Sequence, residues 1–171
     1  MCLEFGDFLR NKIKYINIGG GYVFTDRILN AVIGIATKFE MFGITIIMEP
    51  SYDISNNAGY LVASVVDTFK AFGDNIAVLD TSVNHLPEYF QYSTRPNIVT
   101  DYDYSKSDPE ILHPITLAGA SCLGGDVFGE YKFSKPLKIK DQVIFKNVGA
   151  YSTVMAHRFN GIPLPNLIIK D

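Results

Sequence analysis

The chain has 171 residues, of which 47% are hydrophobic and 19% are charged, and its formal net charge is -3. This composition is typical of one ordinary globular domain or two small ones, and the weakly acidic balance argues against nucleic acid and anionic membranes as partners. The first ten residues, MCLEFGDFLR, contain charges and no apolar run of the signal-peptide type, so we expect a cytoplasmic protein.

A strand, a glycine-rich turn and a helix follow one another near the N-terminus. Tyr15 to Ile18 form a short β-branched run, and the glycines Gly19 to Gly21 come directly after it. Apolar residues at helical spacing predict a helix over residues 26–39, which Thr25 or Asp26 could cap. Ile44 to Met48 read as a second buried strand. Together these segments predict a β-loop-α-β unit.

The rest of the chain has the pattern of a compact β domain. Residues 60–69 and 76–79 read as strands, although the first segment also fits a helix by periodicity. A polar stretch over residues 91–114 predicts a long loop. Four further strands are predicted between glycine, Lys-Pro and Asp turn signals, at Ile115–Ala118, Val127–Phe133, Leu137–Phe145 and Val148–Met155. We predict an α/β domain over residues 1–70 and a β domain over residues 71–171.

Two features of the α/β part could bind a ligand. Backbone N–H groups of Gly19, Gly20 and Gly21, next to a helix N-terminus, could converge on a phosphate, or the glycines could simply make a tight turn. Neither a GxGxxG fingerprint nor a Gly-Lys-Ser/Thr loop is present. Glu49 ends the second strand, where a carboxylate could pair with a protonated ring nitrogen of a cofactor, or could cap a helix or form an ion pair.

Two features of the β part could carry chemistry. Cys122 lies in the stretch GASCLGGDVFGEY, which predicts an irregular loop that also contains Asp126; the cysteine could transfer protons or could be an inert packing residue. Tyr151 ends a predicted strand and could donate to a phosphate or be half-buried.

Metal chemistry is not suggested by the remaining residues. Cys2 and Cys122 form no CxxC pair, and the three histidines, His85, His113 and His157, lack metal-ligand spacing. We expect these histidines on the surface or in loops.

Five motifs, taken in order, resemble the pyridoxal-phosphate decarboxylases of fold type III, the ornithine, diaminopimelate and arginine decarboxylase family. They are IGGG, Glu49-Pro50, AVLDTSVNHLPEYF, SCLGGDVFGEY and the pair GAYS and FNGIPLP. Within the family, the forms of the last three look more like carboxynorspermidine decarboxylase and related siderophore-pathway enzymes than like ornithine decarboxylase. The resemblance implies the last βα units of a TIM-type (β/α)8 barrel, followed by a C-terminal β-sandwich or β-barrel domain.

The resemblance also implies a role for each candidate residue. Gly19, Gly20 and Gly21 would cradle the phosphate of pyridoxal 5'-phosphate, Glu49 would pair with its ring nitrogen, and Tyr151 would donate to the phosphate. Cys122 would protonate the decarboxylated substrate carbon, and Asp126 would bind the distal amine of the substrate. In such enzymes this loop serves the active site of the other subunit of a head-to-tail dimer.

The chain departs from the family pattern in two ways. Glu-Pro-Gly followed by Arg or Glu is usual in the family, whereas this chain has Glu49-Pro50-Ser51-Tyr52, so a guanidinium contact to the phosphate is missing. A (β/α)8 barrel takes about 250 residues, and the segment with the Schiff-base lysine is not found here. None of Lys12, Lys14, Lys38 and Lys70 has a matching context.

The sequence therefore predicts the C-terminal portion of a decarboxylase of a basic or diamino acid. It would be inactive alone and would act as a homodimer, or as a heteromer with a chain that carries the N-terminal half of the barrel. Two alternatives remain at this point. One is a non-catalytic pseudo-enzyme or interaction module that dimerises with a full-length homologue, and the other is an unrelated protein that binds phosphate ligands through the glycine turn alone.

Overall fold

The computed structural model describes residues 12–91, 93–100 and 112–170, so Cys2 and half of the predicted loop over 91–114 lie outside the described residues. The chain divides between Asn56 and Asn57 into two compact units. The predicted division between residues 70 and 71 instead falls inside a strand of the second unit. That strand pairs with two other strands of one sheet, which keeps it with the second unit.

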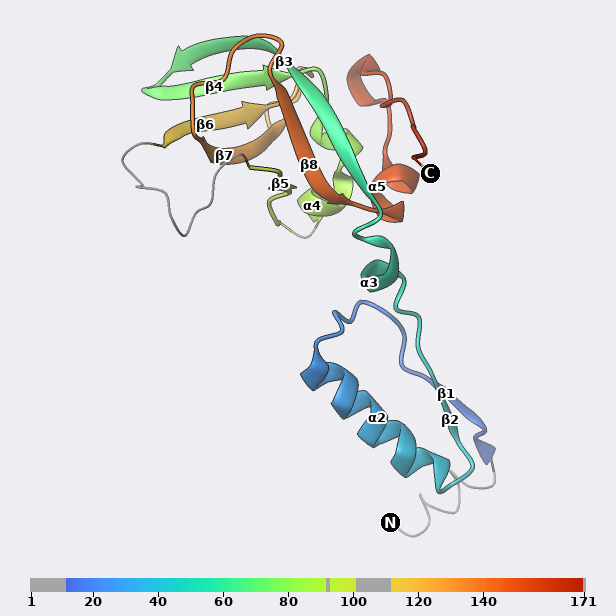
Figure 1. Ribbon diagram of the computed structural model, residues 1–171. Coiled ribbons are helices and arrows are strands. Elements are labelled where there is room, and N and C mark those ends of the chain that lie inside the picture. Colours follow the sequence, from blue (N-terminus) through green and yellow to red (C-terminus); the bar gives the residue numbers. More distant parts are fainter. Residues whose placement is uncertain (1–11, 92, 101–111, 171) are drawn as a thin grey trace. The chain divides into compact units, whose positions relative to one another are not determined.

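The first unit contains the predicted strand-loop-helix-strand segment. Strands β1 (Tyr15–Asn17) and β2 (Thr45–Ile47) pair in parallel, and helix α2 (Asp26–Glu40) connects them (Figure 1). The side chain of Thr25 caps α2 by accepting a hydrogen bond from the Ile28 amide at 3.3 Å. A short helix, α3 (Ser51–Ser55), follows β2. The prediction of a β-loop-α-β unit is confirmed, but the prediction that its two strands are buried is wrong, because no residue of β1 or β2 is buried in the described chain.

The apolar side chains of α2 are only partly covered. No residue of the helix is buried, and the exposed fractions of Leu29, Ile33 and Ile35 are 45%, 53% and 45%. Ile44, just before β2, is buried. Since the burial of apolar side chains supplies most of the stability of a packed helix, α2 retains an apolar surface that could pack against further structure.

The second unit is built around one sheet of six strands in the order β5-β8-β3-β4-β6-β7. β4 and β6 are parallel neighbours, and the other neighbouring strands are antiparallel. The strands are β3 (Gly59–Ala71), β4 (Asp74–Leu79), β5 (Asn97–Ile98), β6 (His113–Ala118), β7 (Val127–Phe133) and β8 (Gln142–Val148).

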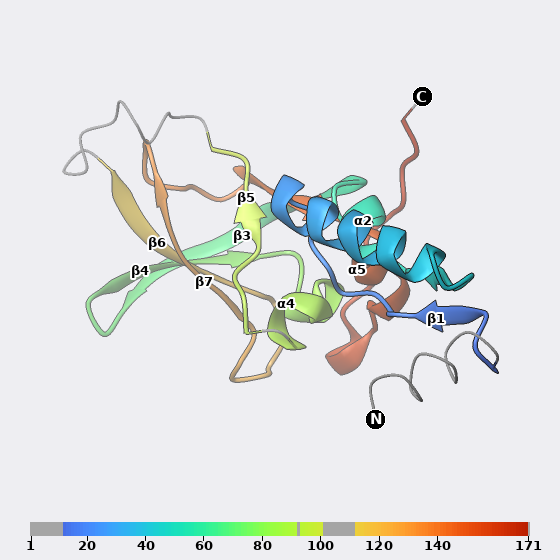
Figure 2. The ribbon, with the colours of Figure 1, turned by 90° about the horizontal axis from the view of Figure 1, so that it is seen from below.

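Strand β3 connects the two parts of this sheet. Its first half pairs with β8 and its second half pairs with β4, with a register shift between Val65 and Asp67. An extra residue in one strand bends it and increases its local twist, and the ribbon views show the sheet curving accordingly (Figures 1 and 2). The described chain is therefore mainly β, a half-barrel sheet with few helices.

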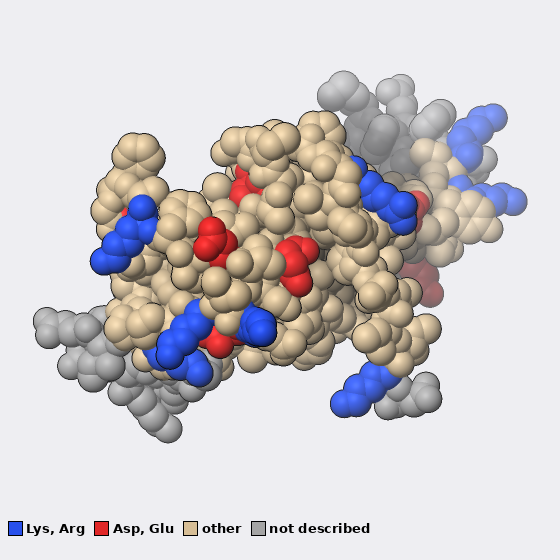
Figure 3. Space-filling model, turned by 90° about the horizontal axis from the view of Figure 1, so that it is seen from above, with Lys and Arg blue, Asp and Glu red and all other residues tan. Residues whose placement is uncertain are grey.

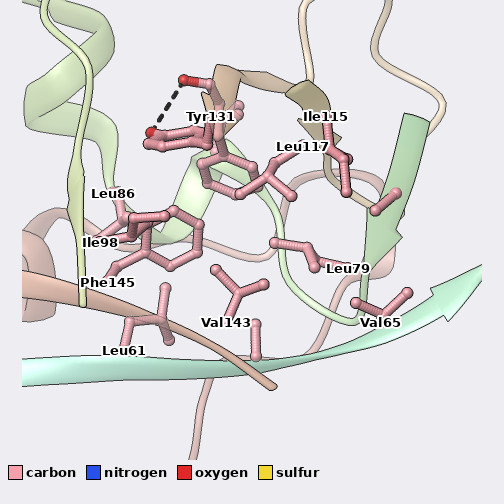
Figure 4. Packing of buried hydrophobic residues seen from close by; sticks show 14 of the residues in the cluster. Leu61, Val65, Leu79, Leu86, Ile98, Ile115, Leu117, Tyr131, Val143 and Phe145 are labelled. Carbon is pink, nitrogen blue, oxygen red and sulfur yellow. Dashed lines mark hydrogen bonds between the residues drawn. The ribbon is translucent and has the colours of Figure 1, made fainter. Parts of the chain in front are cut away.

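One hydrophobic core joins the strands of this sheet to the segment that follows β4 (Figure 4). Alternate residues of β3, β4, β6 and β8 point into it, as the period of two in a strand requires. In β7 the buried residues Phe128 and Tyr131 are three apart, because the register of this strand shifts near Gly129. Phe145 is fully buried, and its ring centroid lies 4.8 Å from that of Phe128. The Tyr131 hydroxyl is also buried and donates a hydrogen bond to the carbonyl of Pro96 at 2.7 Å.

Short helical segments follow β4 and β8. The connection between β4 and β5 contains the 3-10 helix η1 (Val83–His85) and helix α4 (Pro87–Gln91). After β8 come helix α5 (Ala150–Met155) and a second 3-10 helix, η3 (Phe159–Gly161). Helix α5 packs against both α4 and η1.

Two predicted strand positions differ from the structure. The predicted strand Val148–Met155 is wrong: β8 ends at Val148 and α5 follows, which directs the buried Ser152 toward Glu88 of α4. The predicted strand Leu137–Phe145 begins too early. The Asp141 carboxylate accepts a hydrogen bond from the Lys138 amide at 2.9 Å and closes a turn there, so that β8 starts at Gln142.

The surface shown in Figure 3 is mostly uncharged, with basic and acidic side chains interspersed. Within the described ranges, no helix combines the length and the apolar character needed to cross a bilayer.

Candidate functional site

The glycine turn of the first unit joins the end of β1 to the segment before α2. Gly19 and Gly21 have φ values of +73° and +81°, in the left-handed region where a side chain is strained. Gly20 lies so close to the Glu49 carbonyl that a Cβ atom there would clash with it. The turn therefore requires three glycines for two reasons, backbone conformation at the outer two and close packing at the middle one.

Backbone N–H groups of this turn are available to a ligand. The Gly19 amide donates to Oδ1 of Asn17 at 2.8 Å, but the Gly20 and Gly21 amides have no hydrogen-bond acceptor in the part of the chain that the structure describes. They precede a helix of 15 residues, whose N-terminus carries partial positive charge. Two unpaired donors in the turn that leads, through residues 22–25, into α2 fit an anion such as a phosphate group.

The carboxylate of Glu49 is held beside the same turn. Asn17 donates from Nδ2 to Oε1 of Glu49 at 2.6 Å, while the Glu49 amide donates to the Gly19 carbonyl at 2.9 Å. Asn17 thus binds both the glycine turn and Glu49 through one amide side chain. Glu49 is exposed, and its second carboxylate oxygen makes no hydrogen bond within the described residues. A cationic ring nitrogen could bind that oxygen.

The residues after Glu49 provide no cation for a phosphate. Pro50 occupies the N-cap of α3, and Ser51 is the first residue of that helix. The guanidinium that the family pattern usually places after Glu-Pro-Gly has no counterpart at this point of the chain. Any phosphate bound at the glycine turn would be held mainly by backbone donors.

Cys122 lies on the loop between β6 and β7 in the second unit. Its thiol is free and exposed. The loop is closed by backbone hydrogen bonds from Gly119 to the Asp126 carbonyl at 2.7 Å and from Asp126 to the Leu123 carbonyl at 2.9 Å. The thiol is therefore accessible on a loop whose ends are held in place.

Asp126 is buried under this loop, with only 3% of its surface exposed. Its Oδ1 accepts the Val83 amide at 2.8 Å, and its Oδ2 accepts both the amide and the hydroxyl of Ser121, at 3.0 and 2.5 Å. A Cβ atom on Gly119 would collide with the carboxylate, so the glycine leaves room for it. Within this unit Asp126 organises the loop and does not present its carboxylate to solvent.

Tyr151 lies on α5 and is 40% exposed. The next residue, Ser152, is buried and donates its hydroxyl proton to Oε1 of Glu88 on α4. This hydrogen bond fixes the helix that carries Tyr151 against α4.

The structure brings together two groups of predicted residues. Gly19, Gly20 and Gly21 lie beside Glu49 in the first unit, and Asp126 lies beneath the Cys122 loop in the second. A gathering of Gly20, Glu49 and Tyr151 around one cavity would span both units and stays a prediction.

Sequence reasoning missed the buried polar residues around η1. His85 is 3% exposed, so the expectation of a surface or loop histidine is wrong for it; His113 and His157 are exposed. Nδ1 of His85 and the hydroxyl oxygen of Thr81 share a hydrogen bond of 2.7 Å. Burial lowers its pKa, the nearby Asp126 opposes that shift, and His157 adds to it. The available signal was the cluster of short polar residues before His85-Leu86-Pro87, which is typical of a capped turn.

Comparison with known proteins places this arrangement in a family. Residues 15–149 match the family described as pyridoxal-dependent decarboxylase, C-terminal sheet domain. The chain is 35% identical to a carboxynorspermidine/carboxyspermidine decarboxylase of Campylobacter jejuni, over 98% of this chain and 46% of that protein. It is 31% identical to a carboxyaminopropylagmatine decarboxylase of Synechocystis, over 94% of this chain and 42% of that protein. The chain therefore spans less than half the length of these curated relatives.

Solved structures show the same fold. The crystal structure of carboxynorspermidine decarboxylase from Campylobacter jejuni, complexed with norspermidine, matches with a TM-score of 0.76 and 32% identity, covering 96% of this chain and 47% of that chain. A lysine/ornithine decarboxylase from Vibrio vulnificus, complexed with cadaverine, matches with a TM-score of 0.74 at 22% identity, covering 88% of this chain and 42% of that chain, which extends the likeness in fold.

Proposed function

Because the chain belongs to the pyridoxal-dependent decarboxylase family, as its C-terminal sheet domain, we propose that it forms the C-terminal portion of an amino acid decarboxylase. The substrate would be a basic or diamino acid of the carboxynorspermidine type, as the names of the relatives suggest. The first unit would supply the last βα units of a (β/α)8 barrel, and the second would be the accompanying β domain.

The observation that carries this proposal is the pairing of Glu49 with the glycine turn through Asn17. One amide side chain holds a carboxylate next to two unpaired backbone N–H groups, which is the donor and acceptor set that a phosphorylated pyridine needs. Gly20 and Gly21 would bind the phosphate, with Tyr151 as a further donor. Glu49 would accept a hydrogen bond from the protonated ring nitrogen, and its negative charge would keep the proton on that nitrogen. When bound, pyridoxal phosphate supplies an electron sink for the decarboxylation.

Cys122 would deliver a proton from Sγ to the substrate carbon that has lost carbon dioxide. This role needs a second subunit, since we propose that the loop serves the site of its partner in a head-to-tail dimer. The lysine that binds the cofactor would come from the N-terminal half of the barrel, in the same protein or in a companion chain. The exposed Leu29, Ile33 and Ile35 of α2 support such packing, because further βα units would cover them.

Complementation with a relative tests the proposal. The carboxynorspermidine decarboxylase of Campylobacter jejuni is prepared with alanine in place of the cysteine of its own corresponding loop, so that its lysine and cofactor remain. This variant is mixed with the 171-residue chain, and both association and polyamine production are measured. We expect activity to rise at least about tenfold, a conservative fraction of what one general acid contributes.

The matched control is the Cys122→Ala chain, which should associate equally and restore nothing. Association without any gain in activity would contradict the proposed catalytic role and would favour the non-catalytic interaction module. A failure of the two proteins to associate would contradict the proposed dimer.

A further inference from the structure

The connection between β4 and β5 is buried to an unusual degree for a segment that joins two strands. Thr81, Ser82, Asn84, His85 and Glu88 each have an exposed fraction of 6% or less. Connecting segments normally run over the surface, because their polar groups need water. In this segment, residues 81–91, internal hydrogen bonds replace part of that water. The Ser82 hydroxyl accepts the amide of Asn84 at 3.2 Å and its side chain at 2.8 Å.

One end of this segment is attached to the Cys122 loop. The Val83 amide donates to Oδ1 of Asp126, and the Ala120 amide donates to the Thr81 carbonyl at 2.9 Å. Through its other oxygen, Asp126 holds the residue next to Cys122. The buried carboxylate therefore joins η1 to the backbone on which the thiol is mounted.

The same segment is attached to the helix that carries Tyr151. Glu88 of α4 accepts the hydroxyl of Ser152, and the Asn84 carbonyl accepts the His157 amide at 3.2 Å. The Tyr89 hydroxyl donates to the Asn147 carbonyl, near the end of β8, at 3.1 Å. Figures 1 and 2 both show α4 next to α5.

We infer that residues 81–91 form a rigid positioning segment that fixes the Cys122 loop and the Tyr151 helix relative to each other. Its anchors, Asp126 and Glu88, are buried and act here through their hydrogen bonds to neighbouring residues, so in this link they are positioning residues. The expected contact of Asp126 with the distal amine of the substrate stays a prediction. The functional meaning of this link rests on the proposed function, in which Cys122 and Tyr151 serve decarboxylation. The mechanical link itself is a property of the second unit and can be measured without cofactor.

Coupling between the two attached elements tests the inference in the 171-residue chain. Ser152→Ala removes the hydrogen bond between α5 and α4 but touches no residue of the Cys122 loop. Peptide-resolved hydrogen exchange should show faster exchange in residues 119–126 by about fivefold or more, the lower range of typical coupling between sites. Alkylation of Cys122 provides a second readout of the same loop and should change in rate.

Two control variants separate coupling from general loosening. Ser152→Thr keeps the hydroxyl and should restore slow exchange in residues 119–126. Thr153→Ala removes a neighbouring hydroxyl whose one hydrogen bond among the described residues goes to the Gly149 carbonyl at 3.5 Å, and this change should leave the loop unchanged. Equal loosening by Thr153→Ala would show a general loss of stability and overturn the inference.

Reciprocity provides the second test, because coupling between two sites acts in both directions. Asp126→Asn should speed exchange in residues 150–155 of α5, although the side-chain hydrogen bonds of Asp126 go to Val83 and Ser121 and not to that helix. This variant also keeps the inference testable if Ser152→Ala does not fold. Faster exchange confined to the mutated element in both variants would refute the link, whatever the outcome of the complementation experiment.

Discussion

Gly119→Ala should destabilise the second unit because of a single added methyl group. A Cβ atom at this position would lie closer to the Asp126 carboxylate than 3.0 Å, a distance below which Cβ atoms in proteins essentially never have neighbours. The backbone cannot simply yield, since the Gly119 amide donates to the Asp126 carbonyl at 2.7 Å. The carboxylate must therefore move away from the donors that it binds.

The cost follows from the hydrogen bonds that this movement would break. Asp126 accepts three, from the Val83 amide and from the amide and hydroxyl of Ser121. A hydrogen bond to a charged group contributes about 1.5–3 kcal/mol, and a buried carboxylate without partners costs more. Loss of two of these three hydrogen bonds should lower the free energy of unfolding by about 3–6 kcal/mol. Alanine also reduces the entropy of the unfolded chain, which offsets about 0.4–1 kcal/mol of this loss.

Urea denaturation of the 171-residue chain, followed by circular dichroism, measures this difference in the free energy of unfolding. Gly124→Ala is the matched control in the same loop, because a Cβ atom there meets nothing within 4 Å. We expect the control to stay within about 0.5 kcal/mol of the wild-type chain. A cost below about 1 kcal/mol for Gly119→Ala, or equal values for both variants, would refute the reasoning.

Three further predictions concern the buried core of the second unit. Phe145→Ala should lower the free energy of unfolding by about 3–5 kcal/mol in urea titrations, because its side chain is fully buried against Phe128; a loss under about 1 kcal/mol would be inconsistent with this packing. Burial raises the pKa of Tyr131 above its usual value, so spectrophotometric titration should detect its ionisation only as the chain unfolds in alkali. Tyr131→Phe should lower the free energy of unfolding by about 1–3 kcal/mol, because it leaves the Pro96 carbonyl unpaired. Burial also lowers the pKa of His85 from 6.5. The unfolded chain then binds the proton more readily than the native chain, so the free energy of unfolding should fall as the pH drops below about 6.5, by up to about 1.4 kcal/mol per pH unit. His85→Gln should reduce this slope in urea titrations between about pH 7.5 and 5.5. An unchanged slope would contradict the buried position of His85.

Part of the candidate site could be read from local sequence. The run of Gly19, Gly20 and Gly21 between a β-branched strand and a helical pattern predicted a turn with available N–H groups, and the structure has two unpaired ones among its described residues. Asn17 was missed, although it is only two residues before Gly19. Its two hydrogen bonds reach a neighbouring residue in one direction and Glu49, 32 residues away, in the other. No local pattern distinguishes such an asparagine from one in an ordinary turn.

The sequence by itself determined the elements whose causes are local: helix α2, with its Thr25 cap and apolar periodicity, most of the strands, and the family motifs. Tertiary structure alone decided that His85 and Asp126 are buried, and that residues 150–155 form a helix and not a strand. The hydrogen bonds responsible join Val83 to Asp126 and Glu88 to Ser152, across 43 and 64 residues. Such contacts arise only when the curved sheet brings its connections together, and a buried polar group is stable only once its distant partner is in place.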